Sequence, residues 1–176
     1  MAFIQELKKK DVILVNVQTN LFKKRFIAAA SELAAEFGKV CVASLEVPTM
    51  EIAAALGKAG NGKKSICLIG LAAPGKKACP PGGTCAESDG TIMDLSMVLY
   101  RFIDTTQPKA VLFGPIYVLG QRNDKMEALK FINYLADDAR KSGRKLVLFC
   151  NCTTETARQD CLRDVNLFVD KVLEEK

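Results

Sequence analysis

The sequence predicts a single three-layer α/β domain over residues 1–176, with a mostly parallel sheet and helices on both faces. Its length and its 49% apolar content suit one core that folds without disulfide or metal support. Short apolar runs recur along the chain, and helical patterns lie between them. Because strand and helix alternate, the topology should be parallel with right-handed crossovers.

The predicted strands are apolar at nearly every position, as expected of parallel strands that are covered on both faces. A further segment, Phe168–Leu173, fits either an edge strand or a terminal helix. The five predicted strands are Val12–Val17, Val40–Leu45, Ser65–Gly70, Ala110–Phe113 and Lys145–Cys150.

Apolar residues spaced three or four apart predict four helices. The first carries Phe22, Phe26 and Leu33 on one face and should end at Gly38. The second follows Pro48. The third begins near Thr91, whose hydroxyl can cap it, and the fourth runs from about Asn123 to Lys141.

Two segments fall outside this alternation. Leu71–Gly90 is rich in Pro and Gly and predicts an irregular loop of about twenty residues, a length that is usually functional or mobile. After Cys150 the pattern predicts a loop and a helix over Thr153–Arg163.

Charge and hydropathy patterns argue against nucleic-acid and membrane partners. The chain has 25 Lys+Arg against 20 Asp+Glu, and the excess is spread over several clusters without a dense, aromatic-rich basic stripe. The longest uncharged stretch, Ala110–Gln121, is shorter than the ~20 residues of a membrane span. Lys8–Lys10 follow apolar residues, the reverse of a secretory signal, so we expect a cytoplasmic protein.

The chain contains no histidine. This excludes Ser-His and Cys-His dyads, a His-based zinc site and an imidazole general base.

The first strand-to-helix turn is where a doubly wound sheet commonly binds phosphate. A phosphate loop reads G-x-x-x-x-G-K-[ST]. Residues 17–24 keep Lys23, but Val17 and Phe22 replace the glycines and Lys24 replaces the hydroxyl. Asn20, Lys23 and Lys24 are the candidate nucleotide- or anion-binding residues; the alternative is the solvated side of a helix's first turn, with Phe22 in the core.

The order of these elements and several local patterns resemble the RecA superfamily, and most closely its KaiC-like group. Ser44–Pro48 is similar to the family segment S-[LF]-E-E-x-P, and Asp94–Asp104 resembles the helix before the second nucleotide motif. Pro108–Leu119 looks like that motif, with Gly114-Pro115 where the family has the Mg²⁺ aspartate. The resemblance implies a RecA-like (P-loop NTPase-like) fold with a degenerate nucleotide site and no ATPase activity.

Glu46 is the catalytic candidate that the resemblance carries over. It matches the glutamate that polarises the attacking water in active relatives. The alternative is a glutamate that caps the next helix or faces solvent.

Four cysteines could share one rim of the sheet: Cys79, Cys85, Cys150 and Cys152. Four thiolates there could bind zinc or an iron–sulfur cluster, although their spacings differ from the usual C-x2-C. The alternatives are one redox pair, for which we choose Cys79 with Cys85, and unrelated reduced thiols.

These observations lead us to expect a non-catalytic domain that binds copies of itself or a RecA-like partner ATPase, without a cofactor. The alternatives are an ATP-binding enzyme with an unusual phosphate loop, and a zinc or redox site on the cysteine rim. We expect Pro115–Leu119 to emerge as an exposed apolar contact surface of a homo-oligomer.

Overall fold

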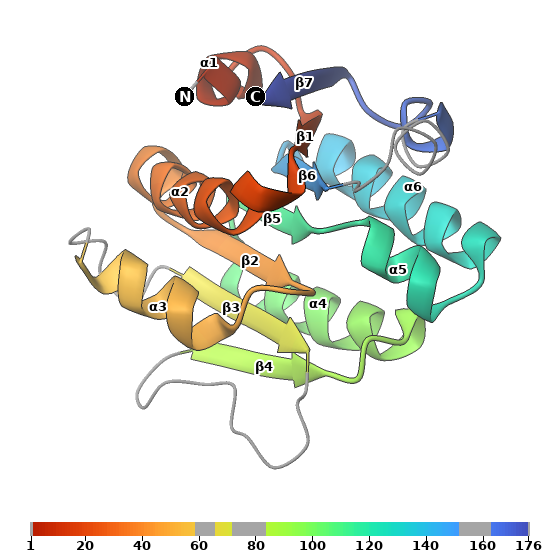
Figure 1. The fold of residues 1–176 in the computed structure, drawn as a ribbon, viewed down its shortest axis with the longest axis horizontal. Helices are drawn as coiled ribbons and strands as arrows, with labels where there is room; N and C mark the ends of the chain where they lie inside the picture. The colour runs from red at the N-terminus through yellow and green to blue at the C-terminus, as the bar shows by residue number, and fades with distance from the viewer. Residues whose placement is uncertain (1, 59–65, 72–83, 152–162, 176) are drawn as a thin grey trace.

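The computed structural model describes residues 2–58, 66–71, 84–151 and 163–175 (Figure 1). Its sheet has seven strands in the order β4-β3-β2-β5-β6-β1-β7, and every described pair is parallel. The strands are β1 (Val12–Val17), β2 (Val40–Ser44), β3 (Ile66–Leu71), β4 (Thr84–Ser88), β5 (Ala110–Gly114), β6 (Lys145–Cys150) and β7 (Lys171–Glu175). The helices are α1 (Ala2–Leu7), α2 (Thr19–Phe37), α3 (Thr49–Lys58), α4 (Ile92–Thr106), α5 (Tyr117–Arg122) and α6 (Lys125–Ser142).

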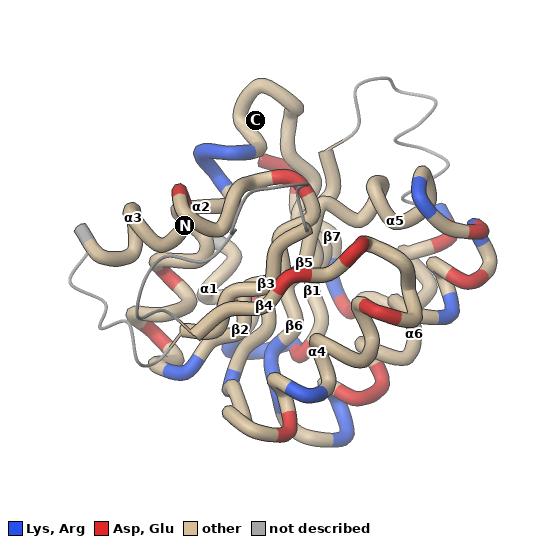
Figure 2. Tube along the Cα trace, turned by 90° about the horizontal axis from the view of Figure 1, so that it is seen from below, with Lys and Arg blue, Asp and Glu red and all other residues tan. Residues whose placement is uncertain are grey.

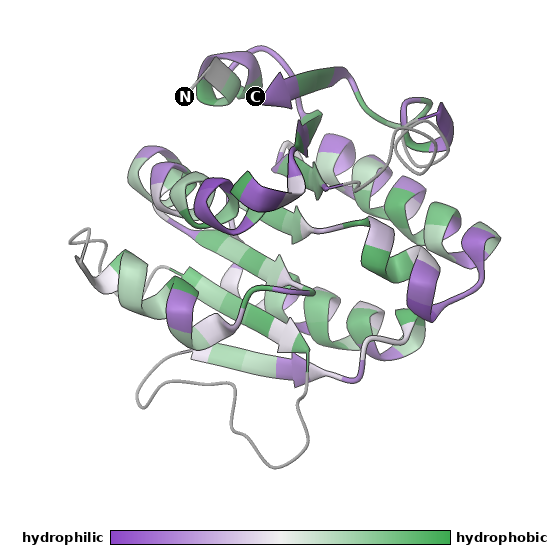
Figure 3. Cartoon of the chain, viewed as in Figure 1, coloured by the Kyte–Doolittle hydropathy of each residue, from purple (hydrophilic) through white to green (hydrophobic). Residues whose placement is uncertain are grey.

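Two apolar layers enclose the sheet, which confirms the predicted three-layer α/β class. Alternate residues of β1 point to opposite faces: Ile13 and Val15 pack with α1, α2 and α3, whereas Val12 and Leu14 pack with α4, α5 and α6. Figure 3 shows the central strands as almost continuously hydrophobic. Burial on both faces therefore explains why these strands are apolar at every position rather than at alternate positions.

The predicted helix ends are largely confirmed. Gly38 ends α2 with a φ of 75°, and Gly143 ends α6 with a φ of 68°. The Thr91 side chain accepts a hydrogen bond from the Asp94 N–H at 3.3 Å at the start of α4. Helix α6 begins at Lys125, after the N-cap Asp124, two residues later than the predicted start near Asn123.

The structure differs from the sequence-based expectation at three places. Strand β4 lies inside the segment predicted as an irregular loop, and α1 was not predicted. Residues after Pro115 form α5 instead of an exposed continuation of the strand, and Ile116, Val118 and Leu119 are buried. The predicted contact surface at Pro115–Leu119 is therefore wrong, because these apolar side chains fill the core beside α6.

The segment Phe168–Leu173, which fitted either an edge strand or a terminal helix, leads into an edge strand, β7. It pairs with β1 along Ile13–Val17. Asp170 holds this strand in place, since its Oδ2 accepts the backbone N–H groups of Asp11 and Val12 at 3.0 and 2.9 Å. Arg140 of α6 donates to the other carboxylate oxygen at 2.8 Å.

The predicted helix over residues 153–163 lies almost wholly outside the described residues. Within the described parts of the chain, none of the helices combines the length and apolarity that crossing a bilayer requires.

Candidate functional site

The carboxyl ends of four neighbouring strands, β2, β5, β6 and β1, form one edge of the sheet. Their last residues are Ser44, Gly114, Cys150 and Val17. Ligands of parallel α/β sheets bind outside this edge. The residues that directly follow these strands are therefore the candidates for a functional site.

The connection from β1 to α2 consists of Gln18 alone. Val17 is the last strand residue and Thr19 the first helical one, and Gln18 has extended backbone with φ −61° and ψ 140°. The Gln18 carbonyl accepts the N–H of Leu21 at 2.9 Å, which begins the helix. A phosphate loop needs several bent residues between strand and helix to surround an anion, and one extended residue leaves no such loop.

The candidate residues of this turn are buried in the core, ion-paired or exposed on α2. Phe22 is buried and packs against Phe26 and Phe149, with ring centroids 5.4 and 6.3 Å away, which places it in the core as expected. Lys23 forms an ion pair with Glu51 of α3. Asn20 and Lys24 are exposed on the first turns of α2.

At the end of β5, Gly114 lies against the backbone of β6. A Cβ added to Gly114 would be 2.8 Å from both Cβ and the carbonyl oxygen of Phe149. Its own carbonyl accepts the N–H of Leu45 at 2.8 Å. The position that resembles the Mg²⁺ aspartate of the family therefore has no room for a carboxylate side chain unless β6 shifts.

Glu46 is held at this edge by a tight turn after β2. The Ser44 hydroxyl donates to the carbonyl of Val47 at 2.8 Å and accepts the Val47 N–H at 2.9 Å, which bends residues 44–47. The Tyr117 hydroxyl of α5 donates to Glu46 Oε2 at 3.1 Å, and Asn151 Nδ2 lies 3.4 Å from the same oxygen. Glu46 thus joins three neighbouring strand ends and is exposed to solvent.

Asn151 is the most buried polar group of this cluster. The residue is only 2% exposed, and its Oδ1 has no hydrogen-bond donor in the described structure. A buried acceptor without a donor costs free energy. The cluster of Glu46, Asn151 and Tyr117 therefore offers a carboxylate and an unused amide oxygen, an arrangement that suits a hydrogen-bond donor better than a phosphate.

The sequence patterns did not predict Asn151 or Tyr117 as site residues. Asn151 could have been predicted, because a polar residue directly after the predicted strand Lys145–Cys150 must lie at the carboxyl edge of the sheet. No feature of the sequence indicated Tyr117, because its position depends on α5, a helix that the pattern of residues 115–119 did not predict.

The rim cysteines are not brought together as far as they are described. Cys85 lies near the start of β4, opposite Leu68 of β3. Cys150 is the last residue of β6 and lies at the carboxyl ends of the strands. Three strands separate β4 from β6, a distance of about 19 Å. Cys79 and Cys152 lie outside the described residues, and among the described residues no three metal-ligating side chains converge.

The described cysteines differ in oxidation state. Cys85 is disulfide-bonded, whereas Cys41, Cys67 and Cys150 are buried and form no disulfide. Burial, and after it the neighbouring Cys67, raises the pKa of Cys41, and burial also raises the pKa of Cys67. These two thiols therefore stay protonated and unreactive in the folded protein.

Comparisons with known proteins agree with the fold. No protein-family model matches the chain, and no curated protein matches its sequence. A KaiC-like protein of the hyperthermophilic archaeon Pyrococcus horikoshii OT3 superposes with a TM-score of 0.64 at 14% identity, over 95% of this chain and 73% of that one. A second protein of this organism, PH0250, gives 0.59 at 14% identity, over 98% and 87%. The chain thus has a RecA-like three-layer α/β fold of the kind found in a KaiC-like protein.

Proposed function

We propose that this chain is a non-catalytic RecA/KaiC-like domain that acts by binding, either to copies of itself or to a partner ATPase. The observation that carries the proposal is the single-residue connection, Gln18, between β1 and α2. A nucleotide-hydrolysing relative needs a loop there to surround the phosphates. Without that loop, the sheet and its helices remain as a scaffold for protein contacts.

Two further contacts support the loss of nucleotide chemistry. Lys23, which would contact phosphate in a phosphate loop, is paired with Glu51 instead. Gly114, which stands where a carboxylate would hold Mg²⁺, lies too close to Phe149 to carry one. The lysine is therefore neutralised by Glu51, and a carboxylate that would hold the metal has no room at position 114.

Association is supported by exposed apolar side chains on α4 and α6. Met93 and Met97 lie one turn apart on α4 and are 75% and 59% exposed, and Tyr134 of α6 is 65% exposed. The Tyr134 ring packs edge-on against Tyr100 of α4, with centroids 5.6 Å apart, so the two helices share this surface. Apolar residues exposed together commonly mark a protein contact.

Light scattering and nucleotide titration together test the proposal. A homo-oligomer at micromolar concentration that binds no Mg-ATP is the expected result for self-association. A monomer that co-purifies with a RecA-like ATPase is the expected result for a partner role. Micromolar Mg-ATP affinity with measurable hydrolysis would contradict both forms of the proposal.

One observation favours the alternative of an ATP-binding enzyme, in a form that relies on Glu46 rather than on a phosphate loop at Gln18. Asn151 Oδ1 lies buried and without a donor in the described structure, next to Glu46 at the edge where nucleotides bind in this fold. If that oxygen binds a nucleotide-associated water, hydrolysis should depend on Glu46. ATP turnover that is lost in Glu46→Gln while the variant keeps its unfolding midpoint would establish this second function.

A further inference from the structure

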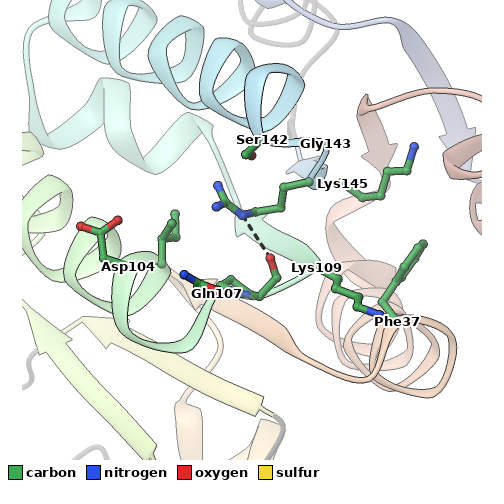
Figure 4. A pocket seen from close by; sticks show the side chains of 10 residues that line it. Phe37, Asp104, Gln107, Lys109, Ser142, Gly143 and Lys145 are labelled. Carbon is green, nitrogen blue, oxygen red and sulfur yellow. Dashed lines mark hydrogen bonds between the residues drawn. The ribbon is translucent and has the colours of Figure 1, made fainter.

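The opposite edge of the sheet holds a pocket that the proposed function does not use. Its volume is about 630 Å³, within the range of small-molecule sites. It lies where β5 and β6 begin, between the ends of α2, α4 and α6 (Figure 4). The residues that line it are Phe37, Ile103, Asp104, Gln107, Pro108, Lys109, Ser142, Gly143, Arg144 and Lys145.

Lysines occupy the start of three neighbouring strands at this edge. Lys39 directly precedes β2, Lys109 directly precedes β5, and Lys145 is the first residue of β6. Their backbones are linked in series, since the Lys109 N–H donates to the Lys39 carbonyl at 2.9 Å and the Lys145 N–H donates to the Lys109 carbonyl at 3.0 Å. Parallel strands lie about 4.8 Å apart, so Lys39 and Lys109, which precede the paired residues Val40 and Ala110, lie side by side, and Lys145 is one position farther along, opposite Ala110.

The three lysines differ in how they are neutralised. Lys145 Nζ is paired with Asp11 at 2.8 Å. Lys39 and Lys109 have no ion pair to an acid among the described residues, although both are exposed. Their charges are therefore available to an anion from solvent.

The Arg144 side chain lines the same pocket and is held in place by two contacts. Its side chain is 12% exposed, its Nε donates to the carbonyl of Pro108 at 3.1 Å, and its Nη1 pairs with Asp138 at 2.5 Å. These bonds hold the guanidinium in one position. Among the described residues that line the pocket, Asp104 is the one acid, and Lys109 is the one cation without an ion pair.

An aromatic ring lies beside the unpaired cation. Phe37 ends α2 and is half-buried, and Figure 4 shows the Lys109 side chain extending toward it. Asp104 lies on the far side of the pocket from both. A flat apolar surface next to a lysine suits a ligand that combines a planar ring with an anionic group.

We propose that this amino-edge pocket binds a nucleoside monophosphate, with the base on Phe37 and the phosphate on Lys109. The volume of about 630 Å³ suits a mononucleotide, and Lys109 is a cation of the lining without an ion pair among the described residues, which suits a phosphate group. The site lies at the opposite edge from Gln18 and Glu46, so it is independent of the proposed function. Ligand at this position would contact the ends of α2 and α4 together.

The test is a calorimetric titration of the intact chain with adenosine monophosphate in the absence of Mg²⁺. We expect a submillimolar dissociation constant that rises about tenfold in Lys109→Gln, through loss of one charge-assisted contact. Phe37→Leu should weaken binding of the nucleotide but leave binding of ribose 5-phosphate unchanged. Lys130→Gln on the outer face of α6 is the matched control and should change neither.

Three results would overturn the proposal. These are no nucleotide binding below about 10 mM, an affinity that Lys109→Gln does not change, and an affinity that Lys24→Gln at the carboxyl edge abolishes. An oligonucleotide that binds while the mononucleotide does not would assign the amino-edge lysines to nucleic acid instead. Because Lys109 is exposed, its variant should keep the wild-type unfolding midpoint, and failure of this test leaves the Mg-ATP result at the other edge unaffected.

Discussion

Gly114 and Phe149 are so closely packed that a methyl group on Gly114 would lie 2.8 Å from both Cβ and the carbonyl oxygen of Phe149. This contact joins the ends of β5 and β6 and fixes the turn that carries α5, since the Phe149 carbonyl also accepts the N–H of Ile116 at 2.8 Å. The placement of Tyr117 beside Glu46 depends on that turn.

Gly114→Ala should therefore destabilise the fold by about 1–3 kcal/mol, because the added methyl group forces β5 and β6 apart. Urea unfolding followed by circular dichroism measures the effect. Gly120→Ala in α5 is the control, since a Cβ there meets no atom within 4 Å. Equal stability of the two variants would contradict the close packing.

Asp170 should make stability depend on pH. Partial burial acts to raise the pKa of Asp170, but bonds from Arg140 and from the N–H groups of Val12 and Asp11 outweigh it, and the net pKa lies below its ordinary value. The stabilisation is then present above the unfolded-state pKa of about 3.9 and disappears as the pH falls through the lower folded-state value.

Asp170→Asn should lower the free energy of unfolding at pH 7 by about 1–2 kcal/mol, through loss of charge-assisted bonds. The difference from wild type should shrink below about pH 4. Asp137→Asn serves as control, because Asp137 is exposed and its contact with Arg140 is 3.7 Å long. A difference that persists unchanged to pH 2 would refute this role of Asp170.

The exposed apolar surface of α4 and α6 gives a prediction about association. Met97→Glu should shift the mass measured by light scattering toward the monomer, because it places a charge within the surface formed by Met93, Met97 and Tyr134. Met50→Glu on α3 is the matched control, since Met50 is also exposed but lies on the other face of the sheet. Identical masses for both variants would exclude this surface.

The fold was predictable because its strands and helices carry strong local patterns. All five predicted strands are present, and the caps at Gly38 and Thr91 were identified from residue type alone. Strand β4 was missed because Thr84–Ser88 is half-exposed and polar, as an edge strand often is, and follows a Pro- and Gly-rich stretch.

The candidate site was less predictable, since its partners depend on tertiary contacts. Nothing in the sequence indicates that Lys23 pairs with Glu51, 28 positions later, or that the Tyr117 hydroxyl reaches Glu46. The amino-edge lysines lie where predicted strands begin: Lys39 and Lys109 directly precede one and Lys145 is the first residue of another. Their proximity, however, depends on the strand order β2-β5-β6. Figure 2 shows Lys and Arg on several separate parts of the chain, interspersed with Asp and Glu.

The disulfide at Cys85 gives a prediction about its partner. We predict that it pairs with Cys79 and is reduced by mild thiol before the protein unfolds, since Cys85 lies half-exposed on the edge strand β4. Mass spectrometry of a non-reduced tryptic digest should find both cysteines in one peptide, 2 Da lighter than after reduction. A cross-link from Cys85 to another peptide, or seven titrating thiols in the native protein, would contradict the pairing.

Isothermal titration calorimetry with Mg-ATP tests the central claim most directly. The single-residue connection at Gln18, the Lys23–Glu51 pair and the absence of space for a carboxylate at Gly114 predict affinity no tighter than about millimolar at the carboxyl edge. Binding that survives Lys23→Ala but weakens in Lys109→Gln belongs to the amino-edge pocket. Micromolar affinity that is abolished by Lys23→Ala would contradict a non-catalytic domain.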